Sequence, residues 1–186
     1  MPTPTNEQNP RRAIIDTCLQ MNAQGINQGT SGNVSQRWQD GFLVSPSALP
    51  YDQTTESDIV FVDLEGIPTG RRKPSSEWRF HKDIYLHRPD IQAIVHTHST
   101  YATALAIKGM EIPPLHYMVA AGGGHTIRCA PYATYGTQAL SDHALVALED
   151  RACCLLANHG VIATGPNLEK ALWLAGEIEV LAQQYC

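Results

Sequence analysis

The sequence has no long apolar segment and no block of basic residues. None of its apolar runs approaches the roughly 20 residues that a helix needs to cross a bilayer. Its 13 Lys and Arg residues are scattered among 18 Asp and Glu residues, which gives a net charge of −5. Nucleic acids and anionic membranes both bind concentrated basic surfaces, so neither is expected as a partner. The composition favours a small-molecule partner.

Cysteine is scarce and shows no pairing pattern. The five cysteines include no Cys-x-x-Cys pair: Cys18, Cys129, Cys153, Cys154 and Cys186. An odd, scattered set favours reduced thiols in a cytoplasmic protein over a disulfide framework, and most of them are expected in the core. The first ten residues are polar and proline-rich, which predicts a flexible tail at 1–10 and one domain over 11–186.

Helical and strand patterns alternate along this domain. Helices are predicted around 14–24, 76–87, 100–108, 116–121, 137–149 and 167–185, and strands around 34–38, 42–44, 59–62, 91–98, 126–131 and 152–164. The Asp40-Gly41 turn joins the first two strands in a hairpin. Hairpin signals mixed with helices predict an α/β fold, a single domain with a central, mainly antiparallel mixed sheet flanked by helices.

Two histidines one residue apart, His96 and His98, end the apolar run 91–95. Strand side chains alternate between faces, so these two project to the same side and can bind one metal ion. A catalytic zinc site typically has three protein ligands and one open position. Further ligands are therefore expected elsewhere in the chain.

His159 and Glu77 are the best candidates for those ligands. His159 ends the apolar segment 153–157 as His98 ends its own, so the two strand ends can meet. Glu77 lies in the first turn of a predicted helix, where it can act as a ligand or as a base toward a metal-polarised substrate. Taken singly, these patterns also fit histidines bonded to backbone carbonyls and a carboxylate favoured by the helix dipole.

Small polar segments are candidates for a phosphate site. Small residues let backbone N–H groups approach an anion, and Asn or Ser side chains add donors. The helix start that carries Glu77 also suits a phosphate. The candidates are Gly32, Asn33, Ser47, Ala48, Ser75 and Ser76. None of these segments is specific by itself, and no Walker-type motif is present.

Six segments, taken in chain order, carry a family resemblance: Asn27–Ser35, Pro74–His81, Val95–His98, Ile112–Met118, Cys129–Thr134 and Asn158–Gly160. Together they resemble the class II sugar-phosphate aldolases of the aldolase/adducin superfamily, and the L-fuculose-phosphate aldolase subfamily most. The resemblance runs from about residue 11 to the end of the chain. Its extent makes it far more specific than any single motif.

This resemblance implies a cofactor and a reaction. One Zn²⁺ per subunit would be held by His96, His98, His159 and Glu77, with Glu77 also serving as the acid/base. A ketose 1-phosphate, either L-fuculose 1-phosphate or a 5-deoxypentulose 1-phosphate, would be cleaved reversibly to dihydroxyacetone phosphate and a small aldehyde. Tyr117 would exchange a proton with the aldehyde oxygen across a subunit interface. The expected assembly is a homotetramer with sites between subunits.

Three departures from the subfamily affect what the resemblance implies. Tyr135 replaces a phenylalanine near the aldehyde, and Ser47-Ala48 replaces Thr-Gly in the phosphate loop. An added hydroxyl without a partner costs roughly 1–3 kcal/mol and can change which aldehyde is accepted. The family also continues past the position of Cys186 into a tail whose tyrosine helps close the site. Weak aldehyde control would follow if that tail is absent.

Two alternatives stay open at the level of sequence. A pentulose-phosphate 4-epimerase or a methylthioribulose-1-phosphate dehydratase belongs to the same superfamily and would yield no dihydroxyacetone phosphate. A non-enzymatic, adducin-like interaction module would be expected to lack the metal ligands, yet all four candidate ligands are present.

Overall fold

The computed structural model describes residues 9–186, so residues 1–8 of the expected tail lie outside it. Asn9 caps the first helix by accepting a hydrogen bond from the N–H of Arg11, and Pro10 is the first residue of that helix. Pro10 therefore belongs to the ordered domain rather than to the tail, because proline fits the first turn of a helix.

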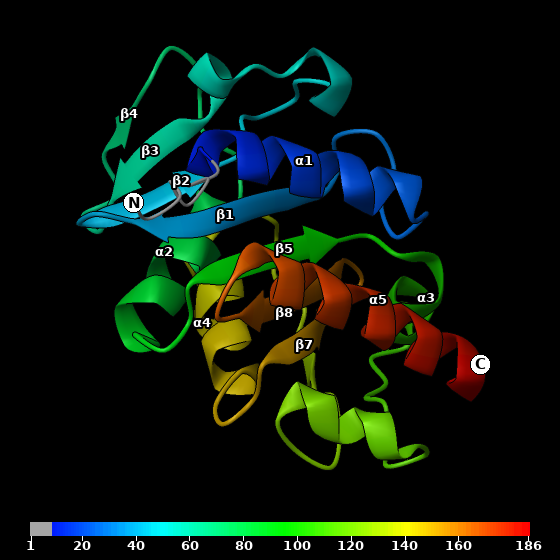
Figure 1. The fold of residues 1–186 in the computed structure, drawn as a ribbon. Coiled ribbons are helices and arrows are strands. Elements are labelled where there is room, and N and C mark those ends of the chain that lie inside the picture. The colour runs from blue at the N-terminus through cyan, green and yellow to red at the C-terminus, as the bar shows by residue number, and fades with distance from the viewer. Residues whose placement is uncertain (1–8) are drawn as a thin grey trace, which may run out of the picture.

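One mixed sheet of eight strands forms the centre of the fold (Figure 1). Its strands are β1 (Asn33–Trp38), β2 (Gly41–Val44), β3 (Val60–Asp63), β4 (Pro68–Thr69), β5 (Ala93–Thr97), β6 (Cys129–Ala130), β7 (Cys153–Leu156) and β8 (Gly160–Gly165). They lie in the order β4-β3-β2-β1-β5-β8-β7-β6, and only the β6–β7 pair is parallel. The predicted fold class is thereby confirmed.

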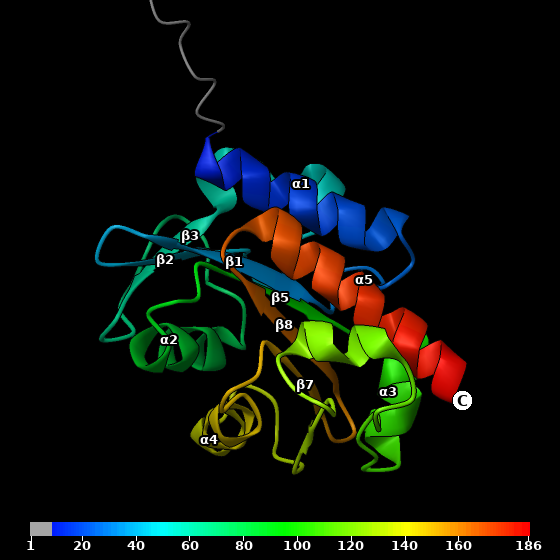
Figure 2. The same ribbon diagram turned by 60° about the horizontal axis from the view of Figure 1, so that its bottom comes forward.

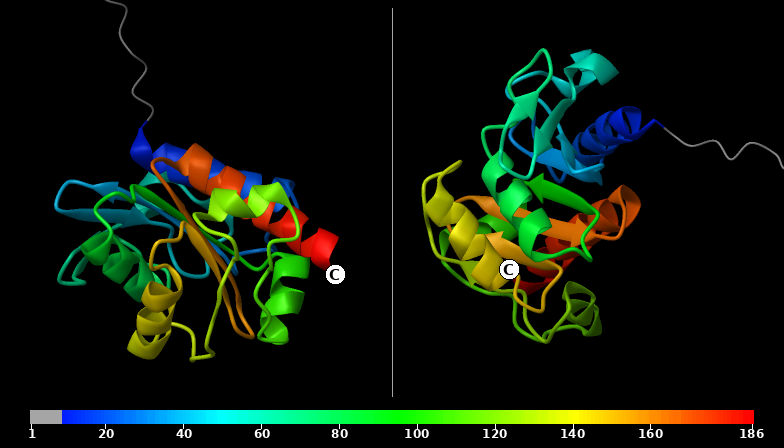
Figure 3. Two further views of the ribbon diagram at one scale, coloured as in Figure 1. Left: turned by 90° about the horizontal axis from the view of Figure 1, so that it is seen from below. Right: turned by 90° about the vertical axis from the view of Figure 1, so that its left-hand side faces the viewer.

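Within residues 9–186, five α-helices cover the two faces of the sheet (Figures 2 and 3). They are α1 (Pro10–Ala23), α2 (Trp78–His87), α3 (Thr100–Ile107), α4 (Gln138–Ala147) and α5 (Leu168–Tyr185), with short 3-10 turns at Tyr51–Gln53, Glu56–Asp58 and Tyr117–Gly122. One apolar core joins α1, α3 and α5 to one face, and a second joins α2 and α4 to the other. Successive side chains of each strand point alternately into the two cores, so the fold has three layers: helices, sheet and helices.

The segment 152–164 differs from the prediction of one continuing strand. The chain turns back after Leu156, and β7 pairs antiparallel with β8. Asn158 makes this reversal with a left-handed backbone, φ 56°, a conformation that asparagine tolerates better than most residues. Periodicity could not reveal the reversal because both arms are apolar and buried.

Two further boundaries differ from the sequence-based expectation. The helix expected from residue 76 begins at Trp78, which leaves Glu77 at its N-cap. The strand expected over 126–131 is reduced to Cys129–Ala130. The short strand β4 has no counterpart among the predicted strands.

Two findings concern the expectations for apolar segments and for cysteines. No helix in the described part of the chain is long and apolar enough to span a membrane. The five cysteines are all free, and Cys18, Cys153 and Cys154 are buried. The expectation that most cysteines are small core residues is confirmed.

Candidate metal centre and anion cleft

The central strands bring three histidines to one place. His96 is in β5, His98 follows that strand directly, and His159 precedes β8, which pairs with β5. Gly160 permits the close approach of the two strand ends, because a Cβ there would lie 2.4 Å from the carbonyl oxygen of Thr97. The predicted meeting of the two strand ends is confirmed.

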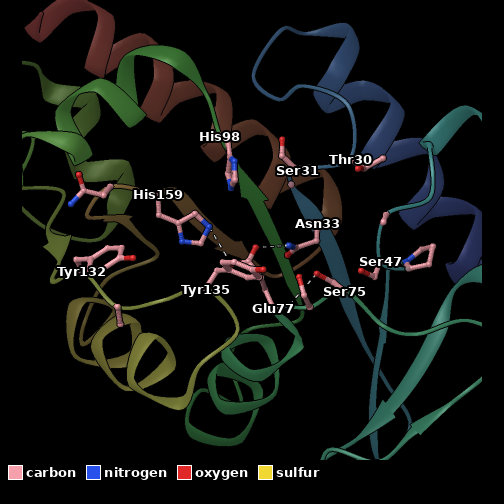
Figure 4. Close-up of a pocket in the computed structure, with 16 residues that line it drawn as sticks. Thr30, Ser31, Asn33, Ser47, Ser75, Glu77, His98, Tyr132, Tyr135 and His159 are labelled. Carbon is pink, nitrogen blue, oxygen red and sulfur yellow. Dashed lines mark hydrogen bonds and ion pairs between the residues drawn. The ribbon is translucent and has the colours of Figure 1, made fainter.

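Glu77 completes a group of four ligand-type side chains. It occupies the N-cap position of α2 without capping the helix, and its carboxylate faces the histidines (Figure 4). Its Oε2 lies 3.1 Å from His96 Nε2, and its Oε1 lies 3.1 Å from His159 Nε2. The Nε2 atoms of His96 and His98 are 3.0 Å apart. One ligand atom from each of the four residues lies within 4.8 Å of the others.

The donor set fits a divalent cation. His96 Nδ1 lies 2.8 Å from the carbonyl oxygen of Val161, which can only accept, so the ring donates from Nδ1. In a neutral ring, Nε2 then carries a lone pair, and it faces Glu77 Oε2 and His98 Nε2. Lone pairs that converge at these distances need a shared cation, either a proton or a metal ion. Three imidazoles and a carboxylate suit zinc and neighbouring metals.

Burial and neighbouring charge set the protonation of this cluster. Burial would raise the pKa of Glu77, but the neighbouring His96 and His159 hold that pKa below its usual range. Burial, together with His96 and His159, lowers the pKa of His98 to about 3. An ionised carboxylate and a neutral imidazole are the forms that bind metal ions.

A cleft of about 380 Å³ opens beside the cluster. Its lining includes Glu77, His98 and His159 and all six phosphate candidates: Gly32, Asn33, Ser47, Ala48, Ser75 and Ser76. In the part of the chain that the structure describes, no hydrogen bond uses the backbone N–H groups of Gly32, Ala48 and Ser76. None of the lining residues is Lys or Arg. Neutral N–H and hydroxyl donors thus form a cradle suited to an anion.

Ala48 adopts the left-handed conformation in this cradle, with φ 56°. Such a conformation costs a non-glycine residue roughly 1–2 kcal/mol. A glycine would adopt this conformation without that cost, and this chain meets the requirement with a small side chain.

Tyrosines occupy two separate places relative to the cleft. Tyr132 and Tyr135 line it, and Figure 4 shows Tyr132 beyond His159, on the side opposite Ser47. Tyr117 is 80% exposed and does not line the cleft. Of the candidate site residues, His96 and Tyr117 do not line the cleft: His96 is buried behind it in the metal-ligand cluster, whereas Tyr117 lies apart from both. Sequence reasoning missed Tyr132, because an aromatic in an extended segment carries no signal of its own.

The fold and the site together define an α/β protein with a His₃-Glu cluster of metal-binding type next to an anion cradle. The family described as Class II Aldolase and Adducin N-terminal domain matches residues 12–186. This chain belongs to that family, as its sequence segments predict.

The similarities to individual proteins are high. The chain is 56% identical to an L-fuculose phosphate aldolase of Escherichia coli K12 over 94% of its own length and 81% of the relative's. It is 54% identical to a 5-methylthioribulose-1-phosphate/5-deoxyribulose-1-phosphate aldolase of Rhodospirillum rubrum, over 94% and 79%. A solved L-fuculose 1-phosphate aldolase superposes with a TM-score of 0.93 at 39% identity, over 97% of this chain and 86% of that one. These relatives confirm the prediction of an aldolase-type enzyme.

Proposed function

We propose that this protein is a zinc-dependent class II aldolase that cleaves a ketose 1-phosphate to dihydroxyacetone phosphate and a small aldehyde. The observation that carries the proposal is the position of the His₃-Glu cluster, which shares one cleft with unpaired backbone N–H donors. The names of the similar proteins support L-fuculose 1-phosphate and 5-deoxyribulose 1-phosphate as substrates. The proposed location is the cytoplasm.

Each residue has a distinct part in this proposal. A Zn²⁺ held by His96, His98, His159 and Glu77 would polarise the substrate carbonyl. In the direction of synthesis, the Glu77 carboxylate, only 4% exposed, would take a proton from the carbon next to the carbonyl, and Tyr117 of a neighbouring subunit would give its hydroxyl proton to the aldehyde oxygen as the carbon–carbon bond forms. Proton exchange with water then restores both groups, and cleavage is the reverse of these steps. The anion cradle holds the phosphate throughout.

The direct test is release of dihydroxyacetone phosphate from L-fuculose 1-phosphate, with 5-deoxyribulose 1-phosphate measured in parallel. We expect release that a chelator stops and that added zinc restores. The ratio of the two values of kcat/KM then identifies the preferred substrate. Turnover without dihydroxyacetone phosphate would replace the proposal with the epimerase or dehydratase alternative. Absence of bound metal and of any turnover would favour an adducin-like module.

Ser76 provides a test of the phosphate cradle. Its side chain is exposed, so Ser76→Ala leaves the fold intact. A hydrogen bond to a charged group contributes about 1.5–3 kcal/mol. We therefore expect KM for the sugar phosphate to rise about tenfold or more, with kcat nearly unchanged. The control is Ser57→Ala, at an exposed serine outside the cleft. An unchanged KM in Ser76→Ala would remove this serine from the phosphate site.

Tyr117 provides a test of the homotetramer with shared sites. We expect Tyr117→Phe and Glu77→Gln each to be nearly inactive as separate proteins. Subunits that are dissociated, mixed and reassembled should regain activity, because some interfaces then combine an intact Tyr117 with an intact Glu77. A control mixture of Tyr117→Phe with itself should stay inactive. Failure to regain activity in confirmed mixed oligomers would place both residues in one subunit's site or remove Tyr117 from it.

A further inference from the structure

A buried ladder of polar side chains extends from Glu77 away from the cleft. Three of its members, spaced four residues apart, run along one side of α2 from its N-cap: Glu77, His81 and Tyr85. The other two, Asn33 and Ser35, are two residues apart on β1 and so face the same side of the sheet. The helix side chains are four residues apart and the strand side chains are two residues apart. The two sets alternate, so that each strand side chain lies between two helix side chains.

Four consecutive hydrogen bonds join the ladder. Asn33 Nδ2 donates to Glu77 Oε2 over 3.0 Å, and Asn33 Oδ1 lies 2.5 Å from His81 Nε2. His81 Nδ1 lies 2.6 Å from Ser35 Oγ, which lies 2.8 Å from the Tyr85 hydroxyl. All five residues are at most 4% exposed, and His81 and Ser35 are fully buried.

The carboxylate fixes the direction of every bond in this ladder. An ionised Glu77 can only accept, so Asn33 must present its NH₂ group to Glu77 and its oxygen to His81. His81 must then donate from Nε2, which leaves Nδ1 as the acceptor of the Ser35 hydroxyl proton. Ser35 in turn accepts from Tyr85. Donors therefore point toward Glu77 at each step.

We infer that His81 is a positioning residue that acts on Glu77 through Asn33. This inference rests on the proposed function of Glu77 as the acid/base. The His81 N–H holds the Asn33 amide oxygen, and this prevents the amide from rotating by half a turn and presenting its oxygen to the carboxylate. The amide N–H then holds one oxygen of Glu77 in place. The second N–H of Asn33 stays available in the cleft, which Asn33 also lines.

The surroundings of His81 keep its ring neutral, as its proposed role in positioning Glu77 requires. Burial lowers the pKa of His81 to about 3, an effect that His96 strengthens and Glu77 opposes. Its ring stacks on Phe80 with centroids 4.5 Å apart and on Phe42 at 6.3 Å. A neutral ring held between aromatics has one N–H to donate, and the ladder directs that proton to Asn33.

Three variants test the positioning part. His81→Phe keeps an aromatic ring but removes both polar nitrogens, and we expect kcat to fall about 10- to 100-fold with metal content unchanged, as for other outer partners of metal sites. His81→Gln retains an N–H donor and an acceptor, so it should recover most of kcat. Phe42→Leu removes ring contacts with His81 and Tyr85 but none of the four hydrogen bonds of the ladder, so it should lower Tm but leave kcat at the wild-type value.

Equal loss of kcat in Phe42→Leu and His81→Phe would overturn the inference, because packing alone would then explain the effect. Wild-type kcat in His81→Phe would overturn it as well. So would a His81→Gln protein that folds, binds metal and stays as slow as His81→Phe.

A spectroscopic measurement on the metal-free protein is independent of both activity and variant folding. In ¹⁵N-labelled protein at neutral pH, the His81 ring, assigned by its loss in His81→Gln, should show the proton on Nε2 and an unprotonated Nδ1. A proton on Nδ1 would overturn the inference. Because this readout needs no substrate, failure of the proposed aldolase reaction would appear as absent turnover in the wild type with the His81 tautomer unaffected.

Discussion

Glu77→Gln is expected to lose catalysis while it keeps its metal. Glutamine has the size of glutamate but cannot take a proton, and a positioned acid/base contributes about 10²–10⁴ in rate. We expect kcat to fall by that factor. His96, His98 and His159 remain as three ligands, which is the usual protein contribution to a catalytic zinc site. Metal content measured by atomic absorption, together with kcat, checks both parts.

The control for this variant is Glu65→Gln, at an exposed glutamate outside the cleft. It makes the same change of charge without entering the site, so kcat should stay at the wild-type value. Wild-type turnover in Glu77→Gln would remove Glu77 from the mechanism. Loss of metal as well as turnover would assign it mainly to metal binding.

His96→Ala is expected to lose both metal and activity. The His96 ring is fully buried, packs edge-on against Phe80 at 5.5 Å and donates to the carbonyl of Val161. Its removal takes away one of three imidazole ligands, leaves a cavity and frees a buried acceptor. Metal content should fall from about one ion per chain to a small fraction of that. The free energy of unfolding should fall by about 2–4 kcal/mol.

A second variant separates metal loss from unfolding. The His159 side chain is 11% exposed and carries less of the packing, so His159→Ala should lose metal and activity with a much smaller change in Tm. His87→Ala, at an exposed histidine near the end of α2, should change neither. Full metal content in both His96→Ala and His159→Ala would contradict the proposed ligand set.

The sequence predicted those site residues whose type is suited to metal binding and whose position is fixed by a strand or helix pattern. The alternation of a strand puts His96 and His98 on one side, and a residue at a strand end is a natural place for His159. Glu77 was recognisable only through the resemblance and the helix start beside it. The place of Tyr132 in the cleft and the positioning role of His81 were not predictable, because a single tyrosine or histidine in a sequence does not show which side chains surround it.

The sequence by itself determined the family, the fold class, most of the helices and strands, and the four ligand-type residues. Hydrophobic periodicity and residue chemistry are local properties that are written directly in the chain. Only the tertiary structure decided the reversal between β7 and β8, the left-handed Ala48, the unpaired N–H groups of the cradle and the direction of the ladder from Tyr85 to Glu77. Each of these depends on which groups from distant segments meet when both faces of the sheet are buried.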